Sequence, residues 1–385
     1  MTPLRRILFL NTMGVIGGQE VVLLDIVRGL DPTRYQTVVA SLFHGDLTDT
    51  LRAEGRTAYV LPPHRLRRPL QLGRTLAALA TLLRRERIDI IHVNGDALLF
   101  YAALAALPWR LPCVWHVYEP VMKRGNTYAR FFYETQRFMH PAWTISDTEA
   151  VRESYLASYP RLGPSTAITP SVDVASVAEG ADAERARRRF ELPPSAPLLL
   201  VIGRLQRSKG QREAIEALAA CSGLPEPPHL VLCGGPPHGT DEDYPAELRA
   251  LVRERGLEQR VHFVGAVTES EKRDLLAACT ALVHPALREA FGIVVIEGMA
   301  AGKPVIVTEA AGPKSIVLGT GAGEIVPTRD VSALAQAITR VLADPARAVR
   351  MGELGRALAA ERYDTRAMVR RVEAVYDAVL ARFRG

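Results

Sequence analysis

Short apolar runs alternate with longer amphipathic segments along this chain, and this alternation constrains the fold more than any other feature. Such alternation is typical of β-α-β units built around a parallel sheet. Parallel strands are buried on both faces, so their sequences are continuously apolar. Because the pattern runs through the chain twice, the sequence predicts an α/β protein with two doubly wound, Rossmann-like domains.

The expected strands are the apolar runs themselves, with helices between them. In the first half they lie near residues 7–11, 37–41, 58–61, 90–93, 114–117 and 142–145. In the second half they lie near residues 198–202, 230–233, 261–264, 281–284 and 304–307.

The length of 385 residues exceeds what one ordinary core organises, which favours two globular domains. Residues 174–197 are dominated by Ala, Glu and Arg and end in prolines, so we expect them to connect the domains. The N-terminal domain then covers residues 1–175 and the C-terminal domain residues 176–365. A last helix, at about 366–383, carries a continuous apolar stripe that must be buried.

The cysteine content and the lengths of the apolar runs indicate the cellular compartment in which the protein is expected. Four cysteines without a C-x-x-C pair indicate neither a zinc knuckle nor a disulfide framework and fit a reducing cytosol. The first apolar run, residues 7–11, is too short for the core of a signal peptide. The longest run elsewhere, residues 97–108, is well short of the roughly 20 residues that span a bilayer. We therefore expect a cytoplasmic protein without a transmembrane helix.

Most of the net charge of +6 lies in the first 175 residues. Arginines flank the apolar segment 76–83, at Arg65, Arg67, Arg68, Arg74, Arg84, Arg85 and Arg87. This segment could lie peripherally on an anionic membrane at the inner face of the cell, and a solvated surface helix is the alternative. Nucleic acid is a weaker interpretation, because no aromatic residues are interleaved with these arginines.

The stretch from His284 to Thr308 carries the strongest chemical signal. A strand ends there, a loop carries Glu289, and a helix is expected from about Phe291. Glu289 is thus expected at the carboxyl edge of a sheet, where open α/β folds bind ligands. Free N–H groups near Phe291 and Gly292, together with the helix dipole, favour a phosphate. Glu297 follows about two turns later, and carboxylates accept hydrogen bonds from the vicinal hydroxyls of a sugar or a ribose.

Two further loops follow expected strands. Arg204 and Lys209 follow the strand at 198–202, and their charges suit a diphosphate. Gly17 and Gly18 follow the first strand and lead into a helix, so backbone can approach an anionic ligand closely. This loop is no G-x-G-x-x-G fingerprint, which argues against NAD.

Glu289-Ala-Phe-Gly followed by Glu297-Gly-Met-Ala-x-Gly-x-Pro-Val resembles the retaining family-4 glycosyltransferases of GT-B fold. The resemblance implies that Glu289 contacts hydroxyls of the donor sugar and that Glu297 holds the nucleotide ribose. It also implies two Rossmann-like domains that face a central cleft, with residues 366–385 returning to complete the first domain. The loop from Glu289 through Ala290, Phe291 and Gly292 belongs to the implied donor site.

The other motifs fit the same family. Gly-Arg-Leu-x-x-x-Lys-Gly at 203–210 is similar to its diphosphate-binding loop, and Gly17-Gly18-x-Glu20 resembles the glycine loop whose backbone faces the donor. For Glu20, a helix-start charge and a ligand contact both remain open. His116 matches a histidine that the family places near the donor sugar, and a core histidine is the alternative.

Three remaining features are interpreted more simply. Asn94 stands where the family often has a histidine, so a role for this position is not implied. Ser146 and Glu149 are expected to form a helix capping box. Residues 118–140 are aromatic and basic, and they could line an acceptor site or form a buried helix.

The resemblance implies sugar transfer from a nucleotide-sugar, UDP- or GDP-linked, with retention of the anomeric configuration. Glu289, His116, Arg204 and Lys209 are the implied catalytic residues, with neither metal nor cofactor. The acceptor class is open: a lipid-linked glycan, a polysaccharide precursor or a small molecule. A sugar-nucleotide 2-epimerase and a non-catalytic sugar-nucleotide-binding protein are the alternatives.

Overall fold

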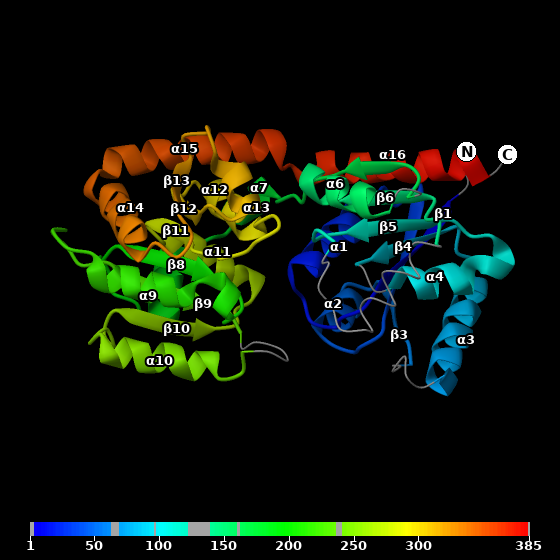
Figure 1. Cartoon of the computed structure of the whole chain (residues 1–385), viewed down its shortest axis with the longest axis horizontal. Helices are drawn as coiled ribbons and strands as arrows, with labels where there is room; N and C mark the ends of the chain where they lie inside the picture. Colours follow the sequence, from blue (N-terminus) through cyan, green and yellow to red (C-terminus); the bar gives the residue numbers. More distant parts are fainter. Residues whose placement is uncertain are drawn as a thin grey trace. The chain divides into compact units, whose positions relative to one another are not determined.

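A computed structural model describes residues 4–62, 69–95, 98–121, 139–159, 162–235 and 241–383. The chain divides into two compact units (Figure 1). The first comprises Met1–Pro170 with Thr365–Gly385, and the second comprises Ser171–Asp364.

The first unit is built on a seven-stranded parallel sheet with the order β3-β2-β1-β4-β5-β6-β7. Its strands are β1 (Arg5–Asn11), β2 (Tyr35–Ser41), β3 (Thr57–Val60), β4 (Ile90–Asn94), β5 (Cys113–Val117), β6 (Trp143–Ser146) and β7 (Ser165–Ala167). Its helices are α1 (Gly18–Gly29), α2 (Asp46–Ala53), α3 (Pro69–Arg85), α4 (Leu99–Ala106), the 3-10 turn η2 (Leu107–Trp109), α6 (Glu149–Ser158) and α16 (Thr365–Phe383). Residues 7–10 of β1 are at most 1% exposed, as a strand covered on both faces requires.

The terminal helix α16 belongs to the first unit although it lies at the far end of the sequence. Its expected apolar stripe is buried, including Val369, Val372 and Tyr376, and the helix packs on α1. A side chain at Gly29 would come within 2.7 Å of Val369, so a residue without Cβ permits this close approach. Burial of the stripe therefore fixes the last helix against the first.

The second unit is built on a six-stranded parallel sheet with the order β10-β9-β8-β11-β12-β13. Its strands are β8 (Leu198–Ile202), β9 (His229–Cys233), β10 (Val261–Gly265), β11 (Ala281–His284), β12 (Val305–Thr308) and β13 (Gly323–Val326). Its helices are α7 (Val174–Ala178), α8 (Ala183–Arg189), the 3-10 turn η3 (Arg207–Lys209), α9 (Gln211–Ala220), α10 (Tyr244–Glu254), α11 (Glu269–Ala278), α12 (Ile293–Ala300), α13 (Ala311–Val317), α14 (Val331–Ala343) and α15 (Pro345–Arg362).

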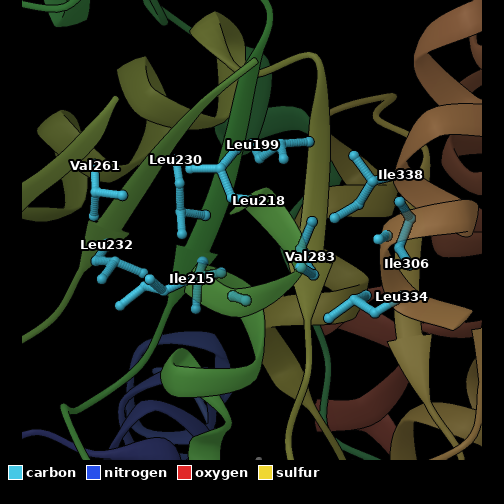
Figure 2. Packing of buried hydrophobic residues seen from close by; sticks show 14 of the residues in the cluster. Leu199, Ile215, Leu218, Leu230, Leu232, Val261, Val283, Ile306, Leu334 and Ile338 are labelled. Carbon is cyan, nitrogen blue, oxygen red and sulfur yellow. The ribbon is translucent and has the colours of Figure 1, made fainter. Parts of the chain in front are cut away.

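The core of the second unit lies between its sheet and covering helices. Figure 2 shows Leu199, Leu230 and Val283 from the strands packed with Ile215 of α9 and Leu334 of α14. All five side chains are at most 2% exposed. This packing holds the strand ends, and the loops that leave them, in fixed positions.

Every strand expected from the sequence is present, whereas β7 and β13 were not expected. Both are short edge strands: β7 reads Ser-Thr-Ala and is half-buried, and β13 begins with Gly323 and Glu324. Their mixed polarity hides them from a search for apolar runs, because an edge strand need not be apolar throughout.

The prediction that residues 174–197 form the interdomain connection is wrong. This stretch folds into α7 and α8 within the second unit, where Val177 and Ala186 are buried. Asp173 and Asp182 cap the two helices. Charged residues dominate the composition of α8, and Glu184, Arg188 and Arg189 among them are exposed, so they concealed an amphipathic pattern.

Candidate active site

Each sheet reverses its strand order once, between β1 and β4 in the first unit and between β8 and β11 in the second. Open parallel sheets bind ligands outside the carboxyl ends of their strands at such a reversal. Lys209 follows β8 and Glu289 follows β11, while Gly17 follows β1 and His116 lies in β5. The sequence-predicted residues therefore gather at the ligand-binding edges of both sheets.

In the second unit, Lys209 and Glu289 form an ion pair. Lys209 Nζ lies 2.5 Å from Glu289 Oε2, and the two side chains remain 25% and 19% exposed. Gly210 makes the meeting possible, since its φ is 73° and a Cβ there would lie 2.0 Å from the Pro285 carbonyl oxygen. The two loops are joined by a backbone hydrogen bond from Leu287 to Ser208, 2.8 Å long.

The carboxylate of Glu289 is ionised at neutral pH. Burial by itself raises its pKa, but the imidazole of His284 and the ammonium of Lys209 outweigh burial and hold the pKa at about 2. His284 Nε2 lies 3.4 Å from Glu289 Oε2, too long for a strong hydrogen bond, and this buried nitrogen makes no hydrogen bond within the described part of the chain. The pair is thus charged, partly open and able to exchange partners.

The loop after Glu289 leads into α12. The helix begins at Ile293, two residues later than expected, because Gly292 is left-handed with a φ of 103°. The side chain of Phe291 is buried and packs against Tyr363, so only its backbone is available to a ligand. The Val295 N–H bonds to the Gly292 carbonyl oxygen at 2.9 Å, and the N–H groups before it at the start of α12 suit an anion.

Arg204 lies immediately after β8, and its side chain is exposed. Gln211 Nε2 donates to the Arg204 carbonyl oxygen at 2.8 Å, which fixes the backbone of the loop. The guanidinium makes no ion pair with any carboxylate in the ranges that the structure describes. Arg204 therefore offers an unneutralised charge at the same sheet edge as Lys209.

Glu297 has a partner that the sequence did not indicate. Its Oε1 accepts a hydrogen bond of 2.6 Å from Lys272 Nζ, and Glu297 is only 7% exposed. Burial raises the pKa of Glu297, and the Lys272 ammonium opposes that rise. Lys272 lies in α11 among charged residues that are typical of a surface helix, so no sequence signal singled it out.

An open pocket of about 770 Å³ adjoins these loops in the second unit. It is lined by Gln206, Arg207, Ser208, Asp241, Leu287, Arg288, Thr328 and Arg329. None of the predicted site residues lines it, and Arg207 is already paired with Asp241 and Glu247. The ionic site at Lys209 and Glu289 is therefore distinct from this hollow.

In the first unit, Gly17 precedes α1 and Gly18 is the first residue of that helix. Glu20 Oε2 accepts from the Gly17 N–H at 3.0 Å, and Glu20 Oε1 accepts from Asn11 Nδ2 at 3.3 Å. Both carboxylate oxygens thus bond to protein groups at the start of the helix. Asn94 also joins this edge, donating to Asn11 Oδ1 at 2.8 Å across the reversal between β1 and β4.

His116 lies inside a buried polar network. Its Nδ1 is 3.2 Å from His92 Nε2 and its Nε2 is 3.2 Å from Asp147 Oδ1, while its ring stacks on Tyr118. His92 Nδ1 lies 2.7 Å from the Tyr376 hydroxyl of α16. Burial lowers the pKa of His116 to about 3 and raises that of Asp147 well above its usual range. Burial therefore disfavours charge in this network. Sequence reasoning missed Asp147 and Tyr376.

Three other predictions have different outcomes. The capping box at Ser146 and Glu149 is wrong: Ser146 ends β6, and Thr148 caps α6 through Val151. Residues 122–138, the greater part of the aromatic and basic segment, lie outside the described residues. In α3, Leu79, Leu82 and Leu83 are buried in the unit's own core, which favours the surface-helix interpretation.

No described helix combines the length and apolarity needed to cross a membrane.

Family models match both halves of the chain. Glycosyltransferase Family 4 matches residues 16–176, and Glycosyl transferases group 1 matches residues 182–358. The chain belongs to the family-4 glycosyltransferases, and the GT-B fold predicted from its sequence is confirmed.

Curated relatives and solved structures are similar to the chain. D-inositol 3-phosphate glycosyltransferase of Corynebacterium urealyticum is 30% identical over 213 residues, 54% of this chain and 50% of the relative. The protein of that name from Corynebacterium glutamicum (strain R) is 27% identical over 307 residues, 74% and 72% of the two chains. HepE of Anabaena in complex with UDP-glucose superposes with a TM-score of 0.85 at 23% identity, over 97% and 99% of the chains. The first relative is thus matched over half of its length.

Proposed function

We propose that the protein is a retaining glycosyltransferase that moves a sugar from a UDP- or GDP-linked donor to a hydroxyl acceptor, with no metal or cofactor. The ion pair between Lys209 and Glu289 carries this proposal. It combines a cation for a phosphate and a carboxylate for sugar hydroxyls at the reversal between β8 and β11.

When the donor binds, Lys209 and Glu289 no longer pair with each other, and each contacts a group of the donor instead. The diphosphate takes Lys209 and the exposed Arg204 as counter-charges, together with the N–H groups at the start of α12. Glu289, released from Lys209, accepts hydrogen bonds from hydroxyls of the transferred sugar. Cleavage places a further negative charge on the leaving diphosphate, and fixed cations at that position lower the barrier by several kcal/mol.

The comparisons support the donor and leave the acceptor broad. One similar structure is a complex with UDP-glucose, and the relatives are named for transfer to D-inositol 3-phosphate. We include a lipid-linked glycan, a polysaccharide precursor and a small molecule as acceptor classes. Retention and the placement of His116 near the donor sugar follow from the family resemblance.

The test begins with thermal unfolding in the presence of UDP-, GDP- and ADP-sugars. A ligand at 100 times its Kd stabilises the folded state by about 2.7 kcal/mol, so the cognate donor raises Tm and the matching nucleoside monophosphate raises it less. The selected donor is then incubated with and without candidate acceptors, and NMR reads the anomeric configuration of the product. An epimer formed without acceptor would support the epimerase instead, and no shift with any donor would refute a donor site.

A further inference from the structure

The contact between Lys272 and Glu297 joins two buried, oppositely charged side chains on neighbouring helices of the second unit. Their side chains are only 13% and 10% exposed. A buried ion pair requires two charges to leave water, and its stabilising contribution to a fold is small or absent. Thermodynamic stability alone is therefore a weak explanation for this pair.

The two oxygens of the Glu297 carboxylate are used unequally. Oε1 accepts from Lys272 Nζ, whereas Oε2 has no hydrogen bond within the described ranges of the chain. Lys272 has a second contact, 2.9 Å to Glu269 Oε2, and the Glu269 side chain is 72% exposed. The lysine is thus anchored at both sides while Glu297 Oε2 remains unused.

A second ion pair on α11 shows what a purely structural contact looks like. Arg185 binds both carboxylate oxygens of Asp274, which also accepts from the Asp182 N–H. That pair ties α8 to α11 and leaves no acceptor oxygen of Asp274 unused. The pair at Glu297 differs because its geometry preserves one oxygen.

We propose that Lys272 is a positioning residue for nucleotide recognition, which holds Glu297 so that Oε2 accepts a hydrogen bond from a ribose hydroxyl. This inference rests on the proposed function and on the family resemblance, which implies that Glu297 holds the nucleotide ribose. A carboxylate accepts strongly from a hydroxyl, and a fixed carboxylate loses less side-chain entropy on binding. Lys272 thereby contributes to the choice of ribose over a deoxyribose without touching the ligand.

The experiment measures Kd for UDP and GDP and for their 2′-deoxy and 3′-deoxy forms by calorimetry. In the wild type, the nucleotide that binds should lose about tenfold in affinity when the contacted hydroxyl is removed. Lys272→Met should weaken the ribonucleotide by about tenfold and the corresponding deoxynucleotide much less, so that discrimination collapses. Lys272→Arg should restore most of the discrimination.

Matched variants separate positioning from folding. Glu297→Gln should lose discrimination as Lys272→Met does, and the double variant should be no worse than either, because both act through one contact. The double variant also removes the unpaired buried charge, so it serves if Lys272→Met is unstable. Arg185→Met breaks the neighbouring ion pair and should retain discrimination.

The outcomes distinguish this inference from the proposed function. The role of Lys272 alone would be overturned if both Lys272→Met and the double variant kept the wild-type discrimination between ribo- and deoxynucleotides. It would also be overturned if the variants lost affinity equally for both kinds of nucleotide. A wild type that binds UDP and GDP without distinguishing any deoxy form would overturn the ribose contact. A wild type that binds neither nucleotide would overturn the proposed function as well.

Discussion

The carboxyl ends of the strands are equivalent positions in the two sheets, yet their chemistry differs. In the second unit Lys209 and Glu289 form a partly exposed ion pair, whereas in the first unit His92, His116 and Asp147 are buried where charge is disfavoured. The topology thus determines where a site can form, and the side chains determine which kind. An ion pair suits an ionic diphosphate, and a buried hydrogen-bonded network holds its side chains in a fixed orientation.

The largest effect is expected at the charged reversal. Glu289→Ala removes the proposed hydrogen-bond acceptor for the donor sugar and should reduce kcat/KM for transfer by at least about 100-fold, a loss of about 2.7 kcal/mol in transition-state stabilisation. Initial rates with the donor found by thermal shift measure this. Glu309→Ala, which breaks an exposed ion pair with Lys314 in the same unit, is the matched control. A folded Glu289→Ala protein within threefold of wild type would remove this residue from the site.

An intermediate effect is expected on the acid stability of the first unit. Burial lowers the pKa of His92 and His116, so the unfolded chain binds protons that the folded chain does not. Each histidine should therefore lower stability by about 1.4 kcal/mol per pH unit as pH falls below about 6.5. Asp147 opposes this fall, because burial raises its pKa and the folded chain binds its proton before the unfolded chain does. The ionised carboxylate of Glu289 contributes to stability over a different pH range. This contribution is present above pH 4.5 and is lost only as pH falls toward 2.

Urea unfolding at several pH values tests this pH dependence of stability. Unfolding is monitored by the fluorescence of the three tryptophans, Trp109, Trp115 and Trp143, all of which lie in the first unit. His116→Asn should reduce the slope between pH 6.5 and 5 by about 1.4 kcal/mol per unit. His44→Asn, whose histidine side chain is 63% exposed, should leave the slope unchanged. Equal slopes in wild type and His116→Asn would contradict a neutral buried network.

The smallest effect is expected where α16 meets the network. Tyr376→Phe removes the hydroxyl that bonds His92 Nδ1 and should cost about 1–2 kcal/mol of stability, because a buried polar nitrogen loses its partner. If the network orients His116, kcat should fall about threefold. Tyr35→Phe removes a hydroxyl that bonds Asp377 of the same helix and should leave kcat unchanged. Identical kcat in both variants would make the network structural only.

Short-range sequence patterns predicted the structural features that depend on residues close together in the chain. The apolar runs located the buried strands, and Lys209 and Glu289 were each expected in a loop after a strand. That these two strands, β8 and β11, are neighbours is shown by the sheet order. The same method failed for β7, β13 and α8, whose polar residues outweigh their buried ones. It also failed at Ser146, since Thr148 caps the helix instead.

The sequence by itself determined the two-sheet architecture and indicated the charged residues of the proposed donor site, because hydrophobic periodicity and loop motifs are local properties of the chain. Only the tertiary structure decided the partners: Lys272 with Glu297, 25 positions apart, and Tyr376 with His92, 284 positions apart. Those contacts depend on how each helix is rotated and seated on its sheet. That arrangement results from packing of the whole core, which no short stretch of sequence specifies.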